Sequence, residues 1–148
     1  MPTNYKEAAS RHFRDANFLW DTGDPTRFLN ASQLYGFSAE CSLKAVLVGL
    51  GLPVKADGGV KDHKKYGHLP YLWNEFSLYA TGALGAHYLA VATPVPPATG
   101  HFDTWKVSDR YAENSIAATR QAEFDDHRKS SIDLIALLEL AIEDGTVT

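Results

Sequence analysis

The chain has 148 residues, enough for one domain with a substantial core, and we expect a single domain over residues 1–148. Its hydrophobic fraction of 45% and charged fraction of 22% are typical of a globular protein and exclude a disordered one. Lys and Arg number 14 and Asp and Glu number 18, so the net charge of −4 excludes a broadly basic surface while allowing a local basic patch.

Two helices are predicted in the first third of the chain. The first opens at Asn4, with Glu7 three residues later as a capping box, and it ends at Gly23. Pro25 is suited to a first helical position, so the second helix is expected to begin there and to cover residues 25–49. Its apolar stripe holds many small residues, which let a neighbouring helix approach closely, so we expect it to be the central helix.

The middle of the chain combines loops with one further helix. Residues 51–67 form a loop rich in Gly and Lys, and a third helix is expected to begin near His68. Gly82, in the second half of this helix, weakens it by about 1 kcal/mol. The prolines of residues 93–97 indicate an extended connection, and residues 101–111 are expected to be irregular.

The last helix is expected over residues 115–143, and no stretch of the sequence predicts a strand. Amphipathic helices without strands bury their apolar stripes against one another. The predicted fold class is therefore all-α, an antiparallel bundle of four to five helices.

The cysteine content and the absence of targeting patterns limit the kinds of site and the cellular location that we expect. The single Cys41 excludes an internal disulfide framework and a four-cysteine zinc module. Since no His, Asp and Glu grouping matches a zinc template either, no metal and no cofactor is expected. The sequence shows neither a basic-then-apolar leader nor an apolar run of 18 residues, so we expect a cytoplasmic chain that does not enter a membrane.

Residues 31–44 carry the most specific pattern in the sequence. They read ASQLYGFSAECSLK, and this block resembles the central helix of bacterial proteins of the HEPN-domain family. Shorter matches to the same family follow in the expected order: Arg11 and His12 with Asp15 and Ala16, His68 and Leu69 with Leu72 and Trp73, and Trp105 with Val107, Arg110 and Tyr111. The matching segments together span about residues 5–111.

The resemblance implies a small antiparallel helical bundle, and we expect a homodimer formed through the last helix or the first two. Members of the family include metal-independent ribonucleases, often toxins of toxin–antitoxin pairs or antiviral factors. Others are non-catalytic modules that bind RNA or nucleotides, frequently paired with a small nucleotidyltransferase. We therefore expect an RNA- or nucleotide-binding protein of a defence or toxin–antitoxin system, with an antitoxin or a small nucleotidyltransferase-like protein as partner. Ribonuclease activity is left open, and the alternative is a non-catalytic helical module that binds a protein partner.

Arg120 and His127 are the candidate catalytic residues, because catalytic members carry an Arg, four to six further residues and then a His. Within one helix, seven steps place both side chains on one face about 10 Å apart. There Arg120 would hold the scissile phosphate, and the imidazole would act as general base or acid for attack by the 2′-OH without a metal. Gln121 departs from the family's pattern, which has Asn, Asp or His after the Arg. The alternative interpretation is a solvated helix face.

Glu40, Lys44, Arg110 and Tyr111 form the candidate nucleotide- or RNA-binding set. Glu40 and Lys44 are spaced for an i,i+4 ion pair on a helix that should be mostly buried, where a carboxylate needs a partner. Arg110 is the expected partner of Glu40, with His12 as the second choice. In the functional interpretation Arg110 and Lys44 face a phosphate-bearing ligand while Tyr111 stacks on a base. In the structural interpretation, the Glu40–Arg110 pair only holds residues 101–111 to the bundle.

The basic concentration of the sequence lies in and just after the glycine-rich loop. Binding groups are often found on such loops, so an RNA-contacting loop is one interpretation. A solvated lysine loop is the other. The residues concerned are Lys55, Lys61, His63, Lys64, Lys65 and His68.

Overall fold

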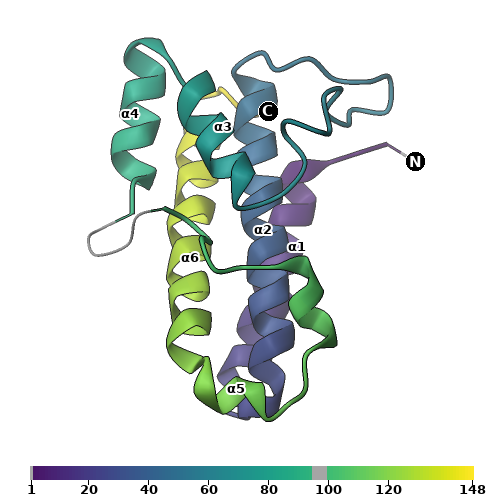
Figure 1. The fold of residues 1–148 in the computed structure, drawn as a ribbon. Helices are drawn as coiled ribbons and strands as arrows, with labels where there is room; N and C mark the ends of the chain where they lie inside the picture. The colour runs from purple at the N-terminus through teal and green to yellow at the C-terminus, as the bar shows by residue number, and fades with distance from the viewer. Residues whose placement is uncertain (1, 95–99) are drawn as a thin grey trace.

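The structure, a computed structural model, describes residues 2–94 and 100–148. Over these residues it contains six α-helices and two short 3-10 helices but no strand, which confirms the all-α fold class. Residues 95–99, which include most of the predicted extended connection, lie outside the described residues. Figure 1 shows three long helices side by side, with shorter helices and loops packed around them.

The first long helix, α1, covers Tyr5–Asp21 and begins as the sequence predicts. The Asn4 side chain accepts a hydrogen bond from the Glu7 backbone N–H at 3.0 Å, which satisfies one of the free donors of the first turn. Helix α1 runs antiparallel to α2, Phe28–Gly49, and the contact is close because small residues line it. The Ser38 hydroxyl of α2 donates to the Ala9 carbonyl of α1 at 2.9 Å.

Helix α2, Phe28–Gly49, is the central element, as its small residues predict. Its first expected turn forms a 3-10 helix instead, η1, Pro25–Arg27, capped by the Asp24 carboxylate. Buried residues make up 16 of the 22 positions in α2, because α1, α3 (Tyr71–Tyr79) and α6 (Gln121–Glu143) all pack on it. Gly36 admits the Trp105 ring: a Cβ there would lie 2.2 Å from a ring carbon.

The sequence predicts one helix in the third position, and this prediction is wrong because two helices occupy the region. Helix α3 covers Tyr71–Tyr79 and helix α4 covers Gly82–Ala92. Gly82 has a φ of 74°, a left-handed conformation that interrupts a helix and that glycine adopts without strain. It therefore separates two helices instead of weakening one. Helix α4 turns onto α6, and the Tyr88 hydroxyl donates to the hydroxyl of Thr146, which follows α6, at 2.8 Å.

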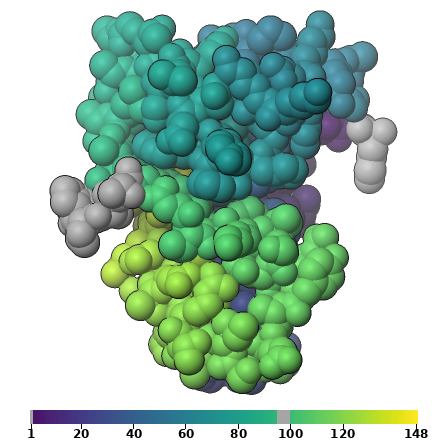
Figure 2. Space-filling view, viewed as in Figure 1, coloured from purple at the N-terminus to yellow at the C-terminus, as the bar shows by residue number. Residues whose placement is uncertain are grey.

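The C-terminal helix is also divided. Helix α5 covers only Ile116–Thr119, and α6 covers Gln121–Glu143. Arg120 separates them with φ −114° and ψ 15°, so this residue precedes α6 and does not lie inside the helix as expected. Residues 101–111 are irregular as predicted, apart from the 3-10 helix η2, Val107–Tyr111. In Figure 2 residues 100–120 extend across the lower half of the molecule.

Helices α2 and α6 run parallel, which corrects the antiparallel expectation for this pair. Near the start of both helices, the Ser32 hydroxyl pairs with the His127 ring at 2.7 Å. Beyond their other ends, a Cβ on Gly49 would lie 2.4 Å from the Thr146 carbonyl oxygen. The chain between the two helices must therefore return along the length of α2, and α3, α4 and residues 100–120 make that return (Figure 1).

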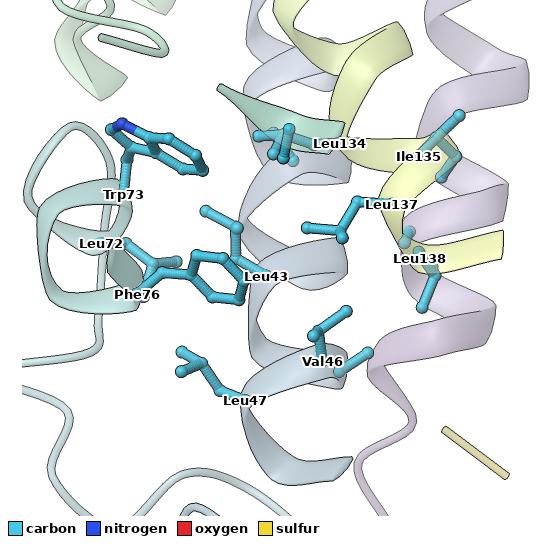
Figure 3. Packing of buried hydrophobic residues seen from close by; sticks show 14 of the residues in the cluster. Leu43, Val46, Leu47, Leu72, Trp73, Phe76, Leu134, Ile135, Leu137 and Leu138 are labelled. Atoms are coloured by element: carbon cyan, nitrogen blue, oxygen red, sulfur yellow. The ribbon is translucent and has the colours of Figure 1, made fainter. Parts of the chain in front are cut away.

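The main hydrophobic core lies between α2, α3 and α6. Figure 3 shows large side chains of the three helices meeting there. Full burial of one such side chain contributes about 1.5–3 kcal/mol relative to exposure. This core fixes the position of α2, which carries the candidate binding residues. The labelled residues are Leu43, Val46, Leu47, Leu72, Trp73, Phe76, Leu134, Ile135, Leu137 and Leu138.

Candidate phosphate-binding seam

The glycine- and lysine-rich segment 51–70 is held against α1 and α2 by three hydrogen bonds. The Thr3 N–H donates to the Asp57 carbonyl at 2.6 Å, and the Val60 N–H donates to the Tyr5 hydroxyl at 3.0 Å. The Leu69 N–H donates to the Glu40 carboxylate of α2 at 3.1 Å. The segment therefore occupies a defined place beside the C-terminal half of α2 (Figure 1).

Glu40 is 5% exposed, and its partners are not the ones expected from the sequence. Besides the Leu69 amide, the carboxylate contacts the His68 ring nitrogen Nδ1 at 3.3 Å. The predicted Glu40–Arg110 ion pair is not formed. Arg110 lies on η2, which packs near Gln33, since the Gln33 side-chain amide donates to the Lys106 carbonyl at 2.8 Å. Gln33 precedes Glu40 by about two helical turns, roughly 10 Å along α2.

His12, the second expected partner of Glu40, lies elsewhere on the α1–α2 contact. Its ring packs against Phe37 with ring centres 5.8 Å apart. Burial, followed by the positive charge of Arg11, lowers the pKa of His12 below its ordinary value of 6.5. A neutral ring on an aromatic neighbour is a packing contact, so His12 has no role in holding the Glu40 carboxylate.

Lys44 is 6% exposed, so its aliphatic stem lies among buried side chains, while its Nζ is not one of the buried polar atoms. Its Nζ lies 5.8 Å from the centre of the Tyr5 ring. Among the described residues no carboxylate lies within ion-pair distance of this nitrogen, since Glu40, one turn earlier, contacts His68 and Leu69 instead. The i,i+4 ion pair suggested by the sequence is therefore not formed, and the Lys44 ammonium reaches the surface without a carboxylate beside it.

Further basic groups from the 51–70 segment gather near Lys44. The rings of His63 and His68 lie 5.3 Å apart and nearly perpendicular. Lys55 lies over Gly59, where a Cβ would be 3.3 Å from its Cε. Burial lowers the pKa of His63, and Lys44, His68 and Lys55 lower it further while the charge of Glu40 raises it. We call the group formed by Glu40, Lys44, Lys55, His63 and His68 the α2 seam.

Arg110 and Tyr111 lie outside the α2 seam. Both are on η2, where the Arg110 guanidinium lies over the Tyr111 ring at 4.8 Å and the ring itself is exposed. The four predicted binding residues are therefore divided between two places. Histidines of the 51–70 segment join Glu40 and Lys44 instead. Two features of the sequence pointed to these histidines. The buried Glu40 needs a partner, and a run of basic residues precedes His68.

Arg120 and His127 are both engaged by neighbouring side chains. The Arg120 guanidinium donates to the Glu123 carboxylate at 2.8 Å and to the Asp109 carboxylate at 3.1 Å. His127 is 2% exposed, and its ring nitrogens contact the Ser32 hydroxyl at 2.7 Å and the Thr104 hydroxyl at 3.0 Å. The sequence did not indicate either hydroxyl, because the contacts join residues far apart in the chain.

The surroundings of His127 determine its protonation. Burial lowers its pKa from 6.5 to about 4, an effect larger than that of the neighbouring charges. The ring stacks on Phe102 with centres 5.4 Å apart, and at neutral pH it is uncharged. In this conformation the imidazole is buried, and the guanidinium is paired with two carboxylates. Their catalytic role stays a prediction, one that requires both groups to be uncovered.

Other chemistries find little support in the described part of the chain. No group of three or more His, Cys, Asp and Glu side chains is placed there to hold a metal ion. Burial raises the pKa of the Cys41 thiol to about 11, so this side chain is a thiol at neutral pH and a weak nucleophile. Within residues 2–94 and 100–148 no helix has the length and apolar character needed to cross a membrane.

Comparison with family models, with curated proteins and with solved structures finds no match to this chain.

Proposed function

We propose that this chain is a HEPN-like domain that binds RNA or a nucleotide, and that a phosphate group of the ligand contacts Lys44 in the α2 seam. The observation that carries the proposal is the position of the Lys44 ammonium, which reaches the edge of the seam with none of the described carboxylates at ion-pair distance. An ammonium without a carboxylate partner is available to an anion from solution. A phosphate oxygen is such an anion, and lysine commonly binds it as a point charge.

The surroundings of Lys44 support a binding role for this end of α2. Lys55, His63 and His68 bring additional basic groups to the same seam, on a segment fixed by backbone hydrogen bonds. A local basic site of this kind is compatible with the net charge of −4. The resemblance of residues 31–44 to the HEPN central helix agrees with it, since family members bind RNA or nucleotides. A homodimer, a defence or toxin–antitoxin setting and an antitoxin or nucleotidyltransferase-like partner belong to the same proposal.

The proposal is tested by the fluorescence anisotropy of a labelled single-stranded oligoribonucleotide titrated with the protein at low salt. We expect Lys44→Met to weaken binding about tenfold or more, because it removes one charge-assisted contact while keeping an unbranched side chain of similar length. Lys64→Met, on the exposed part of the same segment, is the matched control and should change affinity little. Absence of binding by the unaltered chain, or equal affinity in the Lys44 variant, would contradict the proposal.

Binding in this proposal does not involve cleavage by Arg120 and His127, because both are engaged in the described conformation. Incubation of the purified chain with total RNA in EDTA, beside His127→Ala, checks this. We expect no cleavage by either protein. Cleavage by the unaltered chain alone would establish a metal-independent ribonuclease and assign its site to this pair.

A further inference from the structure

An open groove lies between the first half of α1 and the end of α6. Its volume is about 470 Å³, and five of its six lining residues come from α1 while one, Ile142, comes from α6. Three of the six are cations, one is a carboxylate and one carries a hydroxyl. We call this feature the α1 groove, and its lining residues are Lys6, Glu7, Ser10, Arg11, Arg14 and Ile142.

The three cations of the α1 groove are spread along one face of the helix. Arg11 and Arg14 follow Lys6 by five and eight residues, so the three side chains leave the helix within about 140° of one another. From Lys6 to Arg14 the helix rises about 12 Å. The Lys6 ammonium is held at its own end, where it donates to the Thr148 carbonyl oxygen at 3.2 Å. The arrangement therefore matches an anion that carries several charges in a row.

Arg11 and Arg14 carry charges that the described carboxylates leave unpaired. Both residues are exposed, and in the described part of the chain neither guanidinium forms an ion pair. Glu7, in the same lining, and Asp15, one turn beyond Arg11, are the neighbouring carboxylates of α1, and they pair with neither. An unpaired guanidinium is free to bind a phosphate through two parallel hydrogen bonds. The cations that do form ion pairs are Arg27, Lys65, Arg120 and Lys129, together with His68 when it is protonated.

The α1 groove begins beside the α2 seam. Tyr5, whose ring centre lies 5.8 Å from the Lys44 nitrogen, directly precedes the first lining residue on α1. Burial and the charge of Glu40 raise the pKa of the Cys41 thiol. The charges of Lys44 and Arg11 lower it, so one cation of the seam and one of the groove both act on this side chain. A strand of phosphates that contacts Lys44 can therefore continue onto α1.

The lining favours a nucleic-acid strand over an acidic segment of protein. Protein segments are anchored by apolar and aromatic side chains in pockets that exclude water, and Ile142 is the one apolar residue that the groove offers. A single strand of RNA carries one phosphate per nucleotide, and its backbone is bound by arginine, lysine and hydroxyl side chains. Ser10, which lies between the cations along α1, supplies such a hydroxyl.

From these features we infer that the α1 groove binds the phosphate backbone of a single-stranded RNA, with Arg11 and Arg14 as its principal phosphate contacts. The inference rests on the proposed function for the kind of ligand and adds a second contact region to it. It also favours RNA over a mononucleotide as the ligand, because a mononucleotide carries its phosphate at one place and does not span the seam and the groove.

The salt dependence of RNA binding tests the inference, because each phosphate contact on a single strand adds about 0.7 to the slope of log affinity against log salt concentration. The probe is a labelled oligouridylate of about 12 nucleotides, titrated by fluorescence anisotropy at several salt concentrations. Arg11→Gln combined with Arg14→Gln should weaken binding about tenfold at low salt and reduce the slope by about 1.4.

Two further variants serve as controls for this measurement. Arg27→Gln combined with Lys129→Gln removes the same number of charges at exposed positions outside the groove, and it should keep the slope of the unaltered chain. Arg11→Lys combined with Arg14→Lys keeps the charges of the groove, so it should restore most of the slope.

The outcomes separate the inference from the proposed function. An unchanged slope in the Arg11→Gln, Arg14→Gln variant would overturn the inference, whereas weaker binding by Lys44→Met would leave the proposed function standing. Absence of RNA binding by the unaltered chain would overturn both. A labelled oligoglutamate of similar length is the second probe. If the double glutamine variant lost affinity for oligoglutamate and kept it for RNA, the groove would bind an acidic protein segment and the inference would be overturned.

Discussion

Lys44 keeps its aliphatic stem among the buried side chains of α2, and none of the described carboxylates pairs with its ammonium. Because this nitrogen is not one of the buried polar atoms, its replacement removes no favourable pair and relieves little desolvation. We expect Lys44→Met to change the free energy of unfolding by less than about 0.5 kcal/mol in urea denaturation without ligand. The same substitution weakens ligand binding under the proposed function, so affinity should change while stability does not.

The melting temperature in the presence of inorganic phosphate tests whether Lys44 binds an anion or only packs against its neighbours. Ligand that binds only the folded chain raises its melting temperature by linkage. Phosphate should therefore raise the melting temperature of the unaltered chain and of Lys64→Met more than that of Lys44→Met. A destabilised Lys44→Met variant would show instead that the ammonium has a favourable partner in the folded chain.

His127 makes the stability of the chain sensitive to acid. The folded state holds the ring neutral with a pKa of about 4, whereas the unfolded chain takes up a proton near pH 6.5. Stability is therefore complete above pH 6.5 and falls as the pH decreases toward 4, by about 3 kcal/mol in total from this residue. His101, whose pKa burial also lowers, adds to the same slope.

Urea denaturation at pH 7 and pH 5 checks the contribution of His127. We expect His127→Gln to be less stable than the unaltered chain at pH 7 but to lose less stability between the two pH values. The exposed His87 provides the control, and His87→Gln should keep the full pH dependence. An unchanged slope in His127→Gln would mean that other groups carry the acid sensitivity.

At the scale of the elements, contact between α2 and residues 101–111 depends on the absence of a side chain at Gly36. A Cβ there would lie 2.2 Å from the Trp105 ring, whose Nε1–H donates to the Ser32 carbonyl at 3.0 Å. We expect Gly36→Ala to destabilise the chain by about 1–3 kcal/mol, because the ring must move. In a double-mutant cycle Trp105→Ala should make Gly36→Ala nearly neutral or stabilising. Additive effects would contradict this explanation.

The helix boundaries show which local signals the sequence carries and which it lacks. Asn4, Gly23 and Pro25 mark their boundaries through capping and turn chemistry, and the structure places breaks where they predict. Gly82 was recognised as unfavourable for a helix, but its left-handed conformation depends on α4 turning onto α6. Arg120 carries no breaking signal of its own. Its contacts with Asp109 and Glu123 depend on where η2 lies.

At the scale of the whole molecule, the sequence predicted the helical class and the central place of α2, but not the composition of the site. Glu40 and Lys44 were recognised because a buried helix should not carry charges without partners. The partners come from the 51–70 segment, 28 residues beyond Glu40 in the case of His68. Periodicity describes faces of single elements, so it leaves such long-range pairs undetermined.

The proposed homodimer predicts an oligomeric state that sedimentation velocity measures. The expected interface involves the first two helices or the last one, and Phe18 on α1 is 75% exposed. An exposed aromatic side chain of this kind is enriched at interfaces. We expect the chain to sediment as a dimer and Phe18→Asp to shift it toward monomer. Leu78→Asp on α3, at a residue that is 73% exposed, is the control and should leave the dimer intact.

The parallel arrangement of α2 and α6 has a consequence for how the chain folds. Helix α1 meets α2 through a short turn, so their contacts form locally and early. Docking of α6 must close a loop of about 70 residues, with an entropic penalty of about 4 kcal/mol from its length alone. Until that step is complete, the face of α2 on which α6 packs lacks this cover. A nascent chain in this state presents an apolar helix surface, and its lifetime sets the interval during which aggregation competes with folding.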